Sequence, residues 1–331
     1  MKPSCHWHAV KTELGRSWRF WRVWVGLLCA CAVFGFAVFG AVPPAVVFCH
    51  YNLENYVGED QVAEGGRRAR PKSEQEMAVL IRIISEIRPD ILGVCEMGSA
   101  KLWADFQGRL AAVGLKYESA EYVDGPDPDR HLALLSRFPV VARDSAREVD
   151  YTLAGSVQKV RRGFLDVTVE MGSGYRLRVV GAHLKSKLAA SEGEALIRRH
   201  EAHLLRVHLD GILEADPEVN LLCYGDFNEA KNEPGFQEIV GVRGSAGRMS
   251  DLWAQDAVGD RWTHYWRAAD LYSRIDYLLV SRGLWPEVVR GGARVYRGPD
   301  WNRGSDHRPL YATIVAEDRG GGMQGRGRRR G

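Results

Sequence analysis

The sequence lacks the patterns that mark small disulfide-rich, zinc-binding and repetitive proteins. Its 331 residues include six cysteines, whose spacing fits neither a disulfide framework nor a zinc site. No repeat of fixed period is visible, which argues against solenoids and propellers. Hydrophobic residues make up 45% of the chain and charged residues 26%, so a disordered or collagen-like protein is excluded. No linker interrupts residues 45–316, and we predict one α/β domain there.

The body of the chain has no excess of positive charge, although the whole sequence carries a net charge of +3. Residues 1–22 contain five basic residues and one acidic residue, and residues 319–331 contain five basic residues and no acidic one, which leaves −6 for residues 23–318. This negative body argues against an extended groove for DNA, so binding of a polyanion has to depend on local clusters of cations. The Gly/Arg-rich residues 317–331 are expected to be disordered.

Charge is absent altogether from the twenty residues 23–42. A helix of this length rises about 30 Å, enough to cross the hydrocarbon core of a bilayer. Basic residues precede the run and the next charge is Glu54, so the positive-inside rule predicts export, with the body outside the cytoplasm. We favour an uncleaved membrane anchor within residues 1–44. A cleaved signal peptide, which would give a secreted or periplasmic protein, and a buried core helix are the alternatives.

Apolar runs predict the strands of the body, and polar residues recur where these runs stop. Ser73 and Glu76 form a capping box that begins a helix, and Pro89 ends it. Further helices are predicted near 100–113 and over 192–214. The predicted strands are 45–51, 91–95, 116–123, 131–136, 164–170, 175–182, 219–224, 274–280 and 310–315. Because strand ends can meet at one edge of a sheet, the polar residues at these ends are expected to form one site.

The residue types at these strand ends suit metal-assisted hydrolysis. Their carboxylates and amides form a hard-oxygen set that favours Mg²⁺, or Mn²⁺, over zinc. The histidines among them, His183 and His307, can transfer protons near neutral pH. A divalent metal, a His–Asp pair and amide donors are the groups needed to hydrolyse a phosphate ester. Each motif alone is equally compatible with a turn, a helix cap or a core histidine, so the prediction depends on their combination.

Six motifs follow one another in a fixed order along the body. They are Asn52-Leu53-Glu54-Asn55, Cys95-Glu96, His183-Leu184-Lys185-Ser186-Lys187, Gly225-Asp226-Phe227-Asn228, Arg274-Ile275-Asp276-Tyr277 and Ser305-Asp306-His307. In this order they resemble the successive motifs of the endonuclease/exonuclease/phosphatase family, which has the DNase I-like fold. The resemblance covers about 45–316, and its last three motifs are the most specific. It implies a four-layer α/β sandwich of two packed mixed β-sheets flanked by helices, with the site at one end.

The resemblance implies a metal-binding group. Glu96 resembles the family's metal-binding glutamate. Asn52 and Glu54 resemble the pair on the first strand that lies beside the metal. Asp306 resembles the acid next to a catalytic histidine that is able to reach a metal.

It also implies a catalytic group. His183 resembles the residue that contacts the scissile phosphate. Asp226 and Asn228 resemble the pair that orients water and stabilises the transition state. Asp276 resembles the acid that orients a histidine, here His307. Which group is the general base stays open.

The leading functional hypothesis is a metal-dependent phosphodiesterase or endonuclease that acts on nucleic acid outside the cytoplasm. Many nuclease members have Gln before the glutamate where this chain has Cys95, and the motifs at 52–55 and 183–187 look more like those of exported nucleases and phosphodiesterases. Arg162 and Lys185 are expected to contact substrate phosphate. The alternative substrates are phospholipid headgroups or inositol phosphates, and a non-catalytic binding module is the third hypothesis. We expect a monomer.

Other basic and aromatic residues near the motifs fit either nucleic-acid contacts or ordinary surface and core positions. The basic residues are Arg67, Arg68, Arg70, Arg161 and Lys187. The tryptophans that stack on bases, or else pack in the core, are Trp253, Trp262, Trp266 and Trp301.

Overall fold

The computed structural model describes residues 45–58 and 70–320. The predicted anchor or signal at 1–44, the basic residues Arg67 and Arg68, and the tail from 321 to 331 lie outside the described residues. Between 45 and 58 and between 70 and 320, no helix is long and apolar enough to cross a membrane. These ranges cover nearly all of the predicted domain.

Two six-stranded sheets form the centre of the fold. The first sheet has the order β15 (Arg294–Val295), β16 (Leu310–Val315), β1 (Ala45–Tyr56), β2 (Ile91–Met97), β4 (His131–Ser136), β3 (Ser119–Val123). The second has the order β11 (Ser250–Asp251), β14 (Asp276–Val280), β10 (Leu221–Asp226), β9 (Arg176–His183), β8 (Phe164–Glu170), β5 (Val140–Arg143). Both are mixed, because β1 and β2 pair in parallel, as do β9 and β10, whereas the neighbouring pairs are antiparallel.

Two hairpins lie outside these sheets. β6 (Asp150–Leu153) pairs with β7 (Ser156–Lys159), and β12 (His264–Trp266) pairs with β13 (Leu271–Ser273). Each is short, so its position depends on contacts with the rest of the domain rather than on its own stability.

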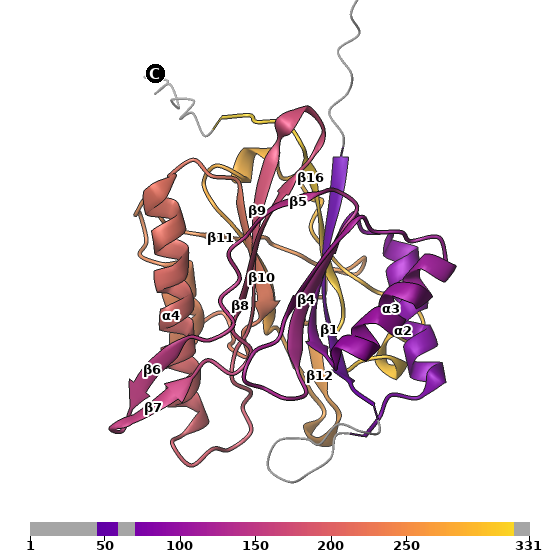
Figure 1. Cartoon of the computed structure of the whole chain (residues 1–331), viewed down its shortest axis with the longest axis horizontal. Coiled ribbons are helices and arrows are strands. Elements are labelled where there is room, and N and C mark those ends of the chain that lie inside the picture. Colours follow the sequence, from indigo (N-terminus) through magenta and orange to yellow (C-terminus); the bar gives the residue numbers. More distant parts are fainter. Residues whose placement is uncertain (1–44, 59–69, 321–331) are drawn as a thin grey trace, which may run out of the picture. The chain divides into compact units, whose positions relative to one another are not determined.

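Helices cover the outer faces of both sheets (Figure 1). α2 (Glu74–Ile87) and α3 (Ala100–Ala112) pack on the first sheet, and α4 (Glu194–Ala215) and α5 (Pro234–Val240) pack on the second. Each of the three interfaces between layers has its own apolar cluster, because the central strands are buried on both faces. The expected four-layer sandwich is confirmed.

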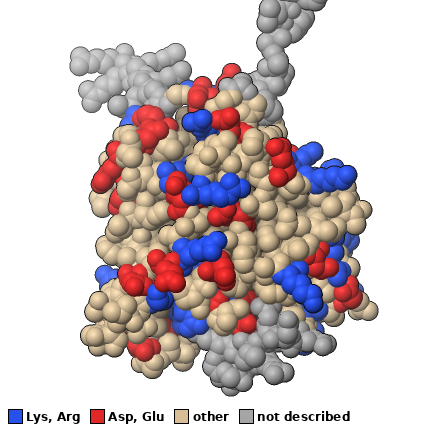
Figure 2. Space-filling view, viewed as in Figure 1, with Lys and Arg blue, Asp and Glu red and all other residues tan. Residues whose placement is uncertain are grey.

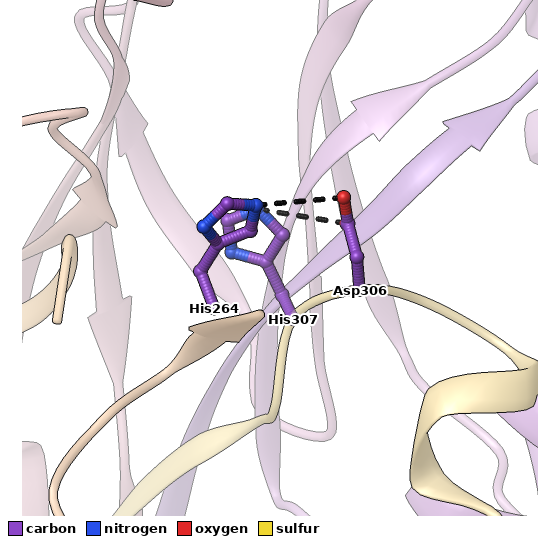
Figure 3. Close-up of side chains that lie close together, drawn as sticks. All are labelled: His264, Asp306 and His307. Carbon is purple, nitrogen blue, oxygen red and sulfur yellow. Dashed lines mark ion pairs between the residues drawn. The ribbon is translucent and has the colours of Figure 1, made fainter. Parts of the chain in front are cut away.

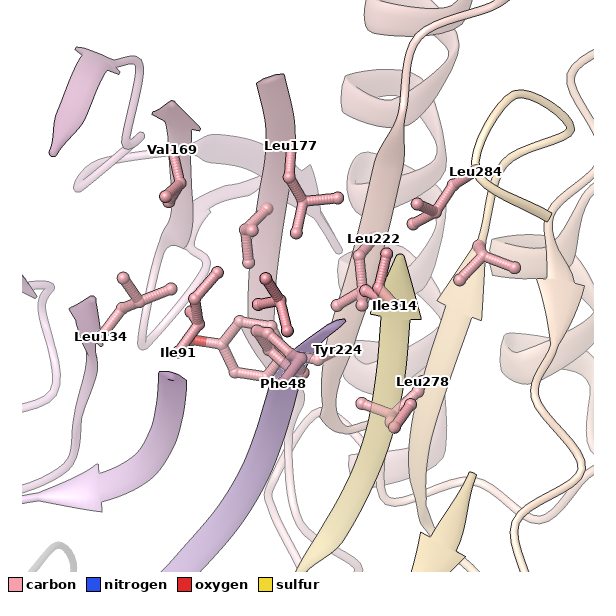
Figure 4. Close-up of a cluster of buried hydrophobic side chains, with 14 of the residues drawn as sticks. Phe48, Ile91, Leu134, Val169, Leu177, Leu222, Tyr224, Leu278, Leu284 and Ile314 are labelled. Atoms are coloured by element: carbon pink, nitrogen blue, oxygen red, sulfur yellow. The ribbon is translucent and has the colours of Figure 1, made fainter. Parts of the chain in front are cut away.

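The cluster between the two sheets contains side chains from both (Figure 4). Phe48 of the first sheet and Leu177 of the second both belong to it. Tyr224 on β10 crosses the gap, and its hydroxyl lies 3.5 Å from the carbonyl oxygen of Ala133 on β4. Gly93 on β2 leaves room for this ring, since a Cβ at position 93 would lie 2.3 Å from Tyr224 Cζ.

The largest difference from prediction concerns β1. The strand predicted over 45–51 continues to Tyr56, through the segment interpreted as polar residues beyond its end. Glu54 and Asn55 have φ values of 50° and 54°, and the register with β2 shifts between Asn52 and Tyr56. β1 therefore continues as an irregular strand where the sequence predicted its end. As a result, the first motif runs alongside β2 and does not leave the sheet.

Candidate active site

The carboxyl ends of two parallel strand pairs, β1–β2 and β9–β10, lie at one edge of the sandwich. In the second sheet, Asp226 pairs with His183 on β9 and with Asp276 on the antiparallel β14. His307, from the loop before β16, places Nε2 3.7 Å from Asp226 Oδ2. The predicted residues that converge here are Asn52, Glu54, Glu96, His183, Asp226, Asn228, Asp276, Asp306 and His307.

Asn52 connects the two sheets at this edge. Its amide nitrogen donates to Glu96 Oε1 at 3.2 Å and to Asp226 Oδ2 at 3.0 Å. Its amide oxygen accepts the backbone N–H of Glu54 at 3.0 Å. The other Glu96 oxygen accepts the backbone N–H of Asn55 at 2.7 Å. Glu96 is thereby fixed in orientation through both of its oxygens.

A buried carboxylate between two imidazoles forms the second part of the site. Asp276 Oδ2 lies 2.8 Å from His307 Nδ1, and Asp276 Oδ1 lies 3.0 Å from His50 Nε2. Burial raises the pKa of Asp276, but the charge and hydrogen bond of His307 outweigh it and hold the pKa well below its usual range. Burial likewise lowers the pKa of His307, and Asp276 reverses this, so the pKa is well above the ordinary value. This arrangement points Nε2 of a cationic His307 towards Asp226.

Burial and neighbouring charges shift the pKa values of the other titratable groups as well. Burial, with the negative charge of Asp276, raises the pKa of Asp226 to about 7. Burial and the charge of Asp306 raise the pKa of Glu54 to about 7. Burial, with the positive charge of Arg162, keeps the pKa of His183 well below its ordinary value, so this imidazole is neutral. Excess negative charge therefore crowds this edge.

Several site residues have a backbone conformation that is costly for residues other than glycine. Glu96 has a φ of 60° and Asn228 a φ of 52°, in addition to the two positive values on β1. The backbone N–H of Asn228 donates to Asp226 Oδ1, and its side-chain nitrogen donates to the Leu184 carbonyl oxygen. Such strain persists only where neighbouring contacts enforce it, and it clusters at functional sites.

A cavity of about 610 Å³ opens beside Glu96 and His183. It lies among the β6–β7 hairpin, the segment at 161–162 and the loop that follows β9. Both predicted phosphate ligands, Arg162 and Lys185, line it. Arg162 is buried with Nη2 3.1 Å from Asp127 Oδ2, and Lys185 Nζ donates to the carbonyl oxygen of Leu188 at 3.1 Å. Arg130, Lys159 and Arg161 also line this cavity.

The remaining basic candidates, Arg70 and Lys187, are not part of the cavity lining, and the tryptophans are either packed against other side chains or exposed. Arg70 and Lys187 pair with Glu76 and Glu233, and neither lines the cavity. Trp262 packs against Trp301, Tyr272 and the guanidinium of Arg308, whereas Trp253 and Trp266 are exposed. On the face shown in Figure 2, basic and acidic side chains are interspersed. That face therefore presents no continuous basic surface for a long polyanion.

Sequence reasoning missed four residues of this edge, which are His50, Lys72, Arg130 and His264. His50 and Asn52 are two apart on one strand, so their side chains point to the same face, and this alternation was the available signal. Arg130 Nε donates to Asn55 Oδ1 at 2.8 Å and lies 3.8 Å from Glu96, although nothing in its local sequence indicates it. The other missed residues are Lys72, 4.0 Å from Glu54, and His264, 3.5 Å from Asp306.

The residues present fit a divalent cation. Carboxylate oxygens of Glu54, Glu96, Asp226 and Asp306 lie at the same edge, and oxygen ligands are those that Mg²⁺ and Mn²⁺ prefer. Burial is the main cause of the raised pKa values of Asp226 and Glu54, and the negative charges of Asp276 and Asp306 raise them further. Ionising these carboxylates together is therefore unfavourable. A cation bound among them would relieve that repulsion.

Comparison with known families and structures agrees with the observed fold. A profile of the endonuclease/exonuclease/phosphatase family matches residues 49–307. A search of curated protein sequences found no match.

Solved structures similar to this chain include the human Nocturnin catalytic domain, at 21% identity and a TM-score of 0.58, covering 82% of this chain and 94% of that one. A Bacteroides vulgatus endonuclease/exonuclease/phosphatase is 15% identical with a TM-score of 0.59, covering 83% and 100%. Sphingomyelinase C from Streptomyces griseocarneus is 15% identical with a TM-score of 0.54, covering 82% and 99%. Similarity at these identities shows the fold alone.

Proposed function

Because the chain belongs to the endonuclease/exonuclease/phosphatase family, we propose that it is a divalent-metal-dependent phosphodiesterase that cleaves nucleic acid. The observation that carries this proposal is the Asp276–His307 pair beside Asp226 and Glu96, with a basic cavity next to them. Hydrolysis of phosphate esters is the coarser conclusion that the family supports. The metal and the substrate are our inferences from the site, and the place of action is our inference from residues 23–42.

Each polar group of the site has a position that suits one step of hydrolysis. Glu96, Glu54, Asn52 and Asp306 are the residues that would hold a Mg²⁺ or Mn²⁺ ion, which when bound neutralises phosphoryl oxygens. Asp276 holds His307 with Nε2 available to donate a proton or hydrogen bond to a phosphoryl oxygen.

Asp226 is the residue best placed to accept a proton from the attacking water. Its Oδ2 lies 3.7 Å from the nearest ring nitrogens of both His183 and His307, so a phosphate between the imidazoles would lie beside it. His183, kept neutral by burial, donates a hydrogen bond to the phosphate without adding a charge. Asn228 fixes the Asp226 carboxylate through its backbone N–H.

The cavity provides the argument about substrate. Arg130, Arg162 and Lys185 surround the space next to Glu96 and His183, where phosphates flanking the scissile bond would lie. Its volume of about 610 Å³ suits a short single-stranded segment rather than a long duplex. The same limited size favours the second candidate, a compact phosphodiester such as a phospholipid headgroup or an inositol phosphate.

A substrate panel with Mg²⁺ tests the proposal. Plasmid DNA, RNA, sphingomyelin and inositol phosphates are incubated with the wild-type protein and with Asp226→Asn, each with and without a chelator. Nucleic-acid cleavage that is lost with the chelator and with the variant is the expected result. Release of headgroups or inorganic phosphate without nucleic-acid cleavage would establish the second candidate, and no turnover of any substrate would refute both.

The uncharged run at 23–42 supports a further part of the proposal, that the domain acts outside the cytoplasm. Fusions of alkaline phosphatase and of β-galactosidase after Pro44 test this. High phosphatase activity is expected, and high β-galactosidase activity alone would show a cytoplasmic domain. Mass analysis of the mature amino terminus then distinguishes an intact anchor from a cleaved signal.

A further inference from the structure

The β12–β13 hairpin brings a third imidazole to the active-site edge. His264 on β12 forms an isolated antiparallel bridge with His307, and the two rings have centroids 4.7 Å apart (Figure 3). Asp306 lies beside both, as the ion pairs drawn in Figure 3 show. No motif in the sequence had assigned His264 a role, and the proposed hydrolysis does not use it.

Both imidazoles are fixed by their other ring nitrogen. His307 Nδ1 is held by Asp276 at 2.8 Å, and His264 Nδ1 lies 3.1 Å from Ser273 Oγ on β13. Each ring therefore presents Nε2 towards Asp306. Histidines that bind metals characteristically have their other ring nitrogen held by a carboxylate, a backbone carbonyl or water. The Asp276 carboxylate holds His307 in this way, and the Ser273 hydroxyl orients the His264 ring.

The spacing of the three ligand atoms suits a small transition-metal ion. Nε2 of His264 lies 3.5 Å from Asp306 Oδ2, and Nε2 of His307 lies 3.8 Å from Asp306 Oδ1. One nitrogen from each ring and one Asp306 oxygen lie within 4.8 Å of one another. In a tetrahedral site with bonds of about 2.0–2.1 Å, neighbouring ligands are separated by about 3.3 Å, so small side-chain movements complete the site.

We propose that His264, Asp306 and His307 form a binding site for a zinc-class transition-metal ion, which shares Asp306 with the hard-oxygen ligands around Glu96. Two imidazoles and one carboxylate favour Zn²⁺ or Co²⁺ over Mg²⁺, because nitrogen ligands suit the borderline-soft ions. Asp306 is 37% exposed, so an ion can enter from solvent and keep an open coordination position.

Occupation of this site has a consequence for catalysis, and this part rests on the proposed function. The ion would bind Nε2 of His307 in place of its proton, which is released to solvent. This nitrogen is the atom that contacts the phosphate in the proposed hydrolysis. Zn²⁺ is therefore an inhibitor of the Mg²⁺-supported reaction, and His264 sets the enzyme's sensitivity to it.

Titration of the full-length protein with Co²⁺ in the presence of excess Mg²⁺ tests the site without any turnover. We expect visible absorption bands from imidazole-bound Co²⁺, which Zn²⁺ displaces. His264→Ala should abolish these bands or weaken Co²⁺ binding at least about tenfold, since loss even of a residue that only orients a ligand costs about 10- to 100-fold in affinity. Ser273→Ala, which removes only the partner of the ring, should weaken binding about tenfold.

His203→Ala is the matched control, because His203 also pairs with a carboxylate, Glu238, but on the outer helix α4. It should leave the Co²⁺ bands unchanged. Bands that persist in His264→Ala, or that disappear equally in His203→Ala, would overturn the proposed site and would show that His264 only donates a hydrogen bond to Asp306. Zn²⁺ inhibition is then measured for each variant relative to its own activity with Mg²⁺ alone. A wild type without turnover contradicts the proposed function and leaves the Co²⁺ result to decide on the site.

Discussion

Replacement of Asp276 by Asn is the sharpest test of the proposed active site. The substitution keeps the size of the side chain and removes its charge. Asp276 accepts from His307 on one oxygen and lies within hydrogen-bonding distance of His50 on the other. Asn has a single oxygen, so it can accept from only one of these two imidazoles, and it no longer stabilises a cationic His307.

The expected loss of activity follows from the strength of this contact. A hydrogen bond to a charged group contributes about 1.5–3 kcal/mol, and about 1.4 kcal/mol corresponds to a factor of ten in rate. Asp276→Asn should therefore lower kcat about 10- to 100-fold. His307→Ala removes the proton donor itself and should lower kcat about 10²- to 10⁴-fold.

The double variant distinguishes a pair from two independent residues. If Asp276 acts through His307, the double variant should be no slower than His307→Ala alone, because the positioned group is already absent. The assay is steady-state kcat on the best substrate of the panel, with the urea-unfolding midpoint of each variant measured in parallel. A further loss of about 10- to 100-fold in the double variant would refute the pairing.

Asp166→Asn is the control for general effects of losing a buried carboxylate. Asp166 on β8 is also fully buried, and it pairs with His208 at 2.7 Å and with Arg178, away from the active-site edge. This control should lower stability, since it breaks buried charge pairs, while kcat stays within about threefold. An equal loss of kcat in both variants would mean that Asp276 has only a structural role.

Three further predictions concern the metal, the core and pH. Glu96→Gln should lower turnover by orders of magnitude and raise the Mg²⁺ concentration needed for half-maximal activity, and unchanged Mg²⁺ dependence would remove Glu96 from the metal site. Gly93→Ala should destabilise by about 1–3 kcal/mol in urea unfolding, because its Cβ would lie 2.3 Å from Tyr224 Cζ, and partial recovery is expected on adding Tyr224→Leu. Burial raises the pKa of Glu287 to about 7, only partly offset by the hydrogen bond from Tyr175. The native state therefore favours its neutral form, and this contribution to stability is lost as pH rises from about 4.5 towards 7. Glu287→Gln should flatten that decline, and an unchanged slope between pH 5 and 7.5 would contradict the assignment.

Much of the site could be predicted because its residues directly follow or end apolar strands. Five buried residues precede Asp226 on β10, and the parallel partner β9 ends at His183. Parallel pairing places such ends together at the same edge, so the residues can be grouped without knowing the register. The register then decides which of them are in contact, and only the structure shows that Asp226 lies opposite both His183 and Asp276.

The irregular end of β1 could not be predicted, because its polar residues look like a turn. Pairing with β2 resumes at Tyr56 and Met97 after the register shift, and that pairing depends on a strand about forty residues away. Glu54 and Asn55 have positive φ values, which cost conformational free energy. The conformational preferences of these two residues do not predict such values.

His264 was missed for a related reason. It lies in a strand of three residues, which is too short to show an alternating pattern. It also lies between Trp262 and Trp266, whose aromatic rings indicate base stacking rather than metal binding. Its position follows from the bridge to His307 and from the backbone N–H of Tyr265, which donates to the Asp306 carbonyl oxygen at 2.9 Å. Contacts between segments about forty residues apart leave no local periodicity in the sequence.

For the proposed function, the cations around the cavity would provide a local phosphate-binding surface on a negatively charged body. Arg162 is held against Asp127, and Arg130 is held by Asn55 near Glu96, so both are oriented by polar partners before any substrate arrives. Cations fixed in this way lose little side-chain entropy on binding a phosphate, whereas mobile surface lysines lose more. The carboxylates of Asp127 and Glu96 partly neutralise these two charges at longer range, which lowers non-specific attraction for long polyanions. A few oriented cations beside a catalytic edge therefore favour recognition of a local phosphodiester over binding along an extended duplex.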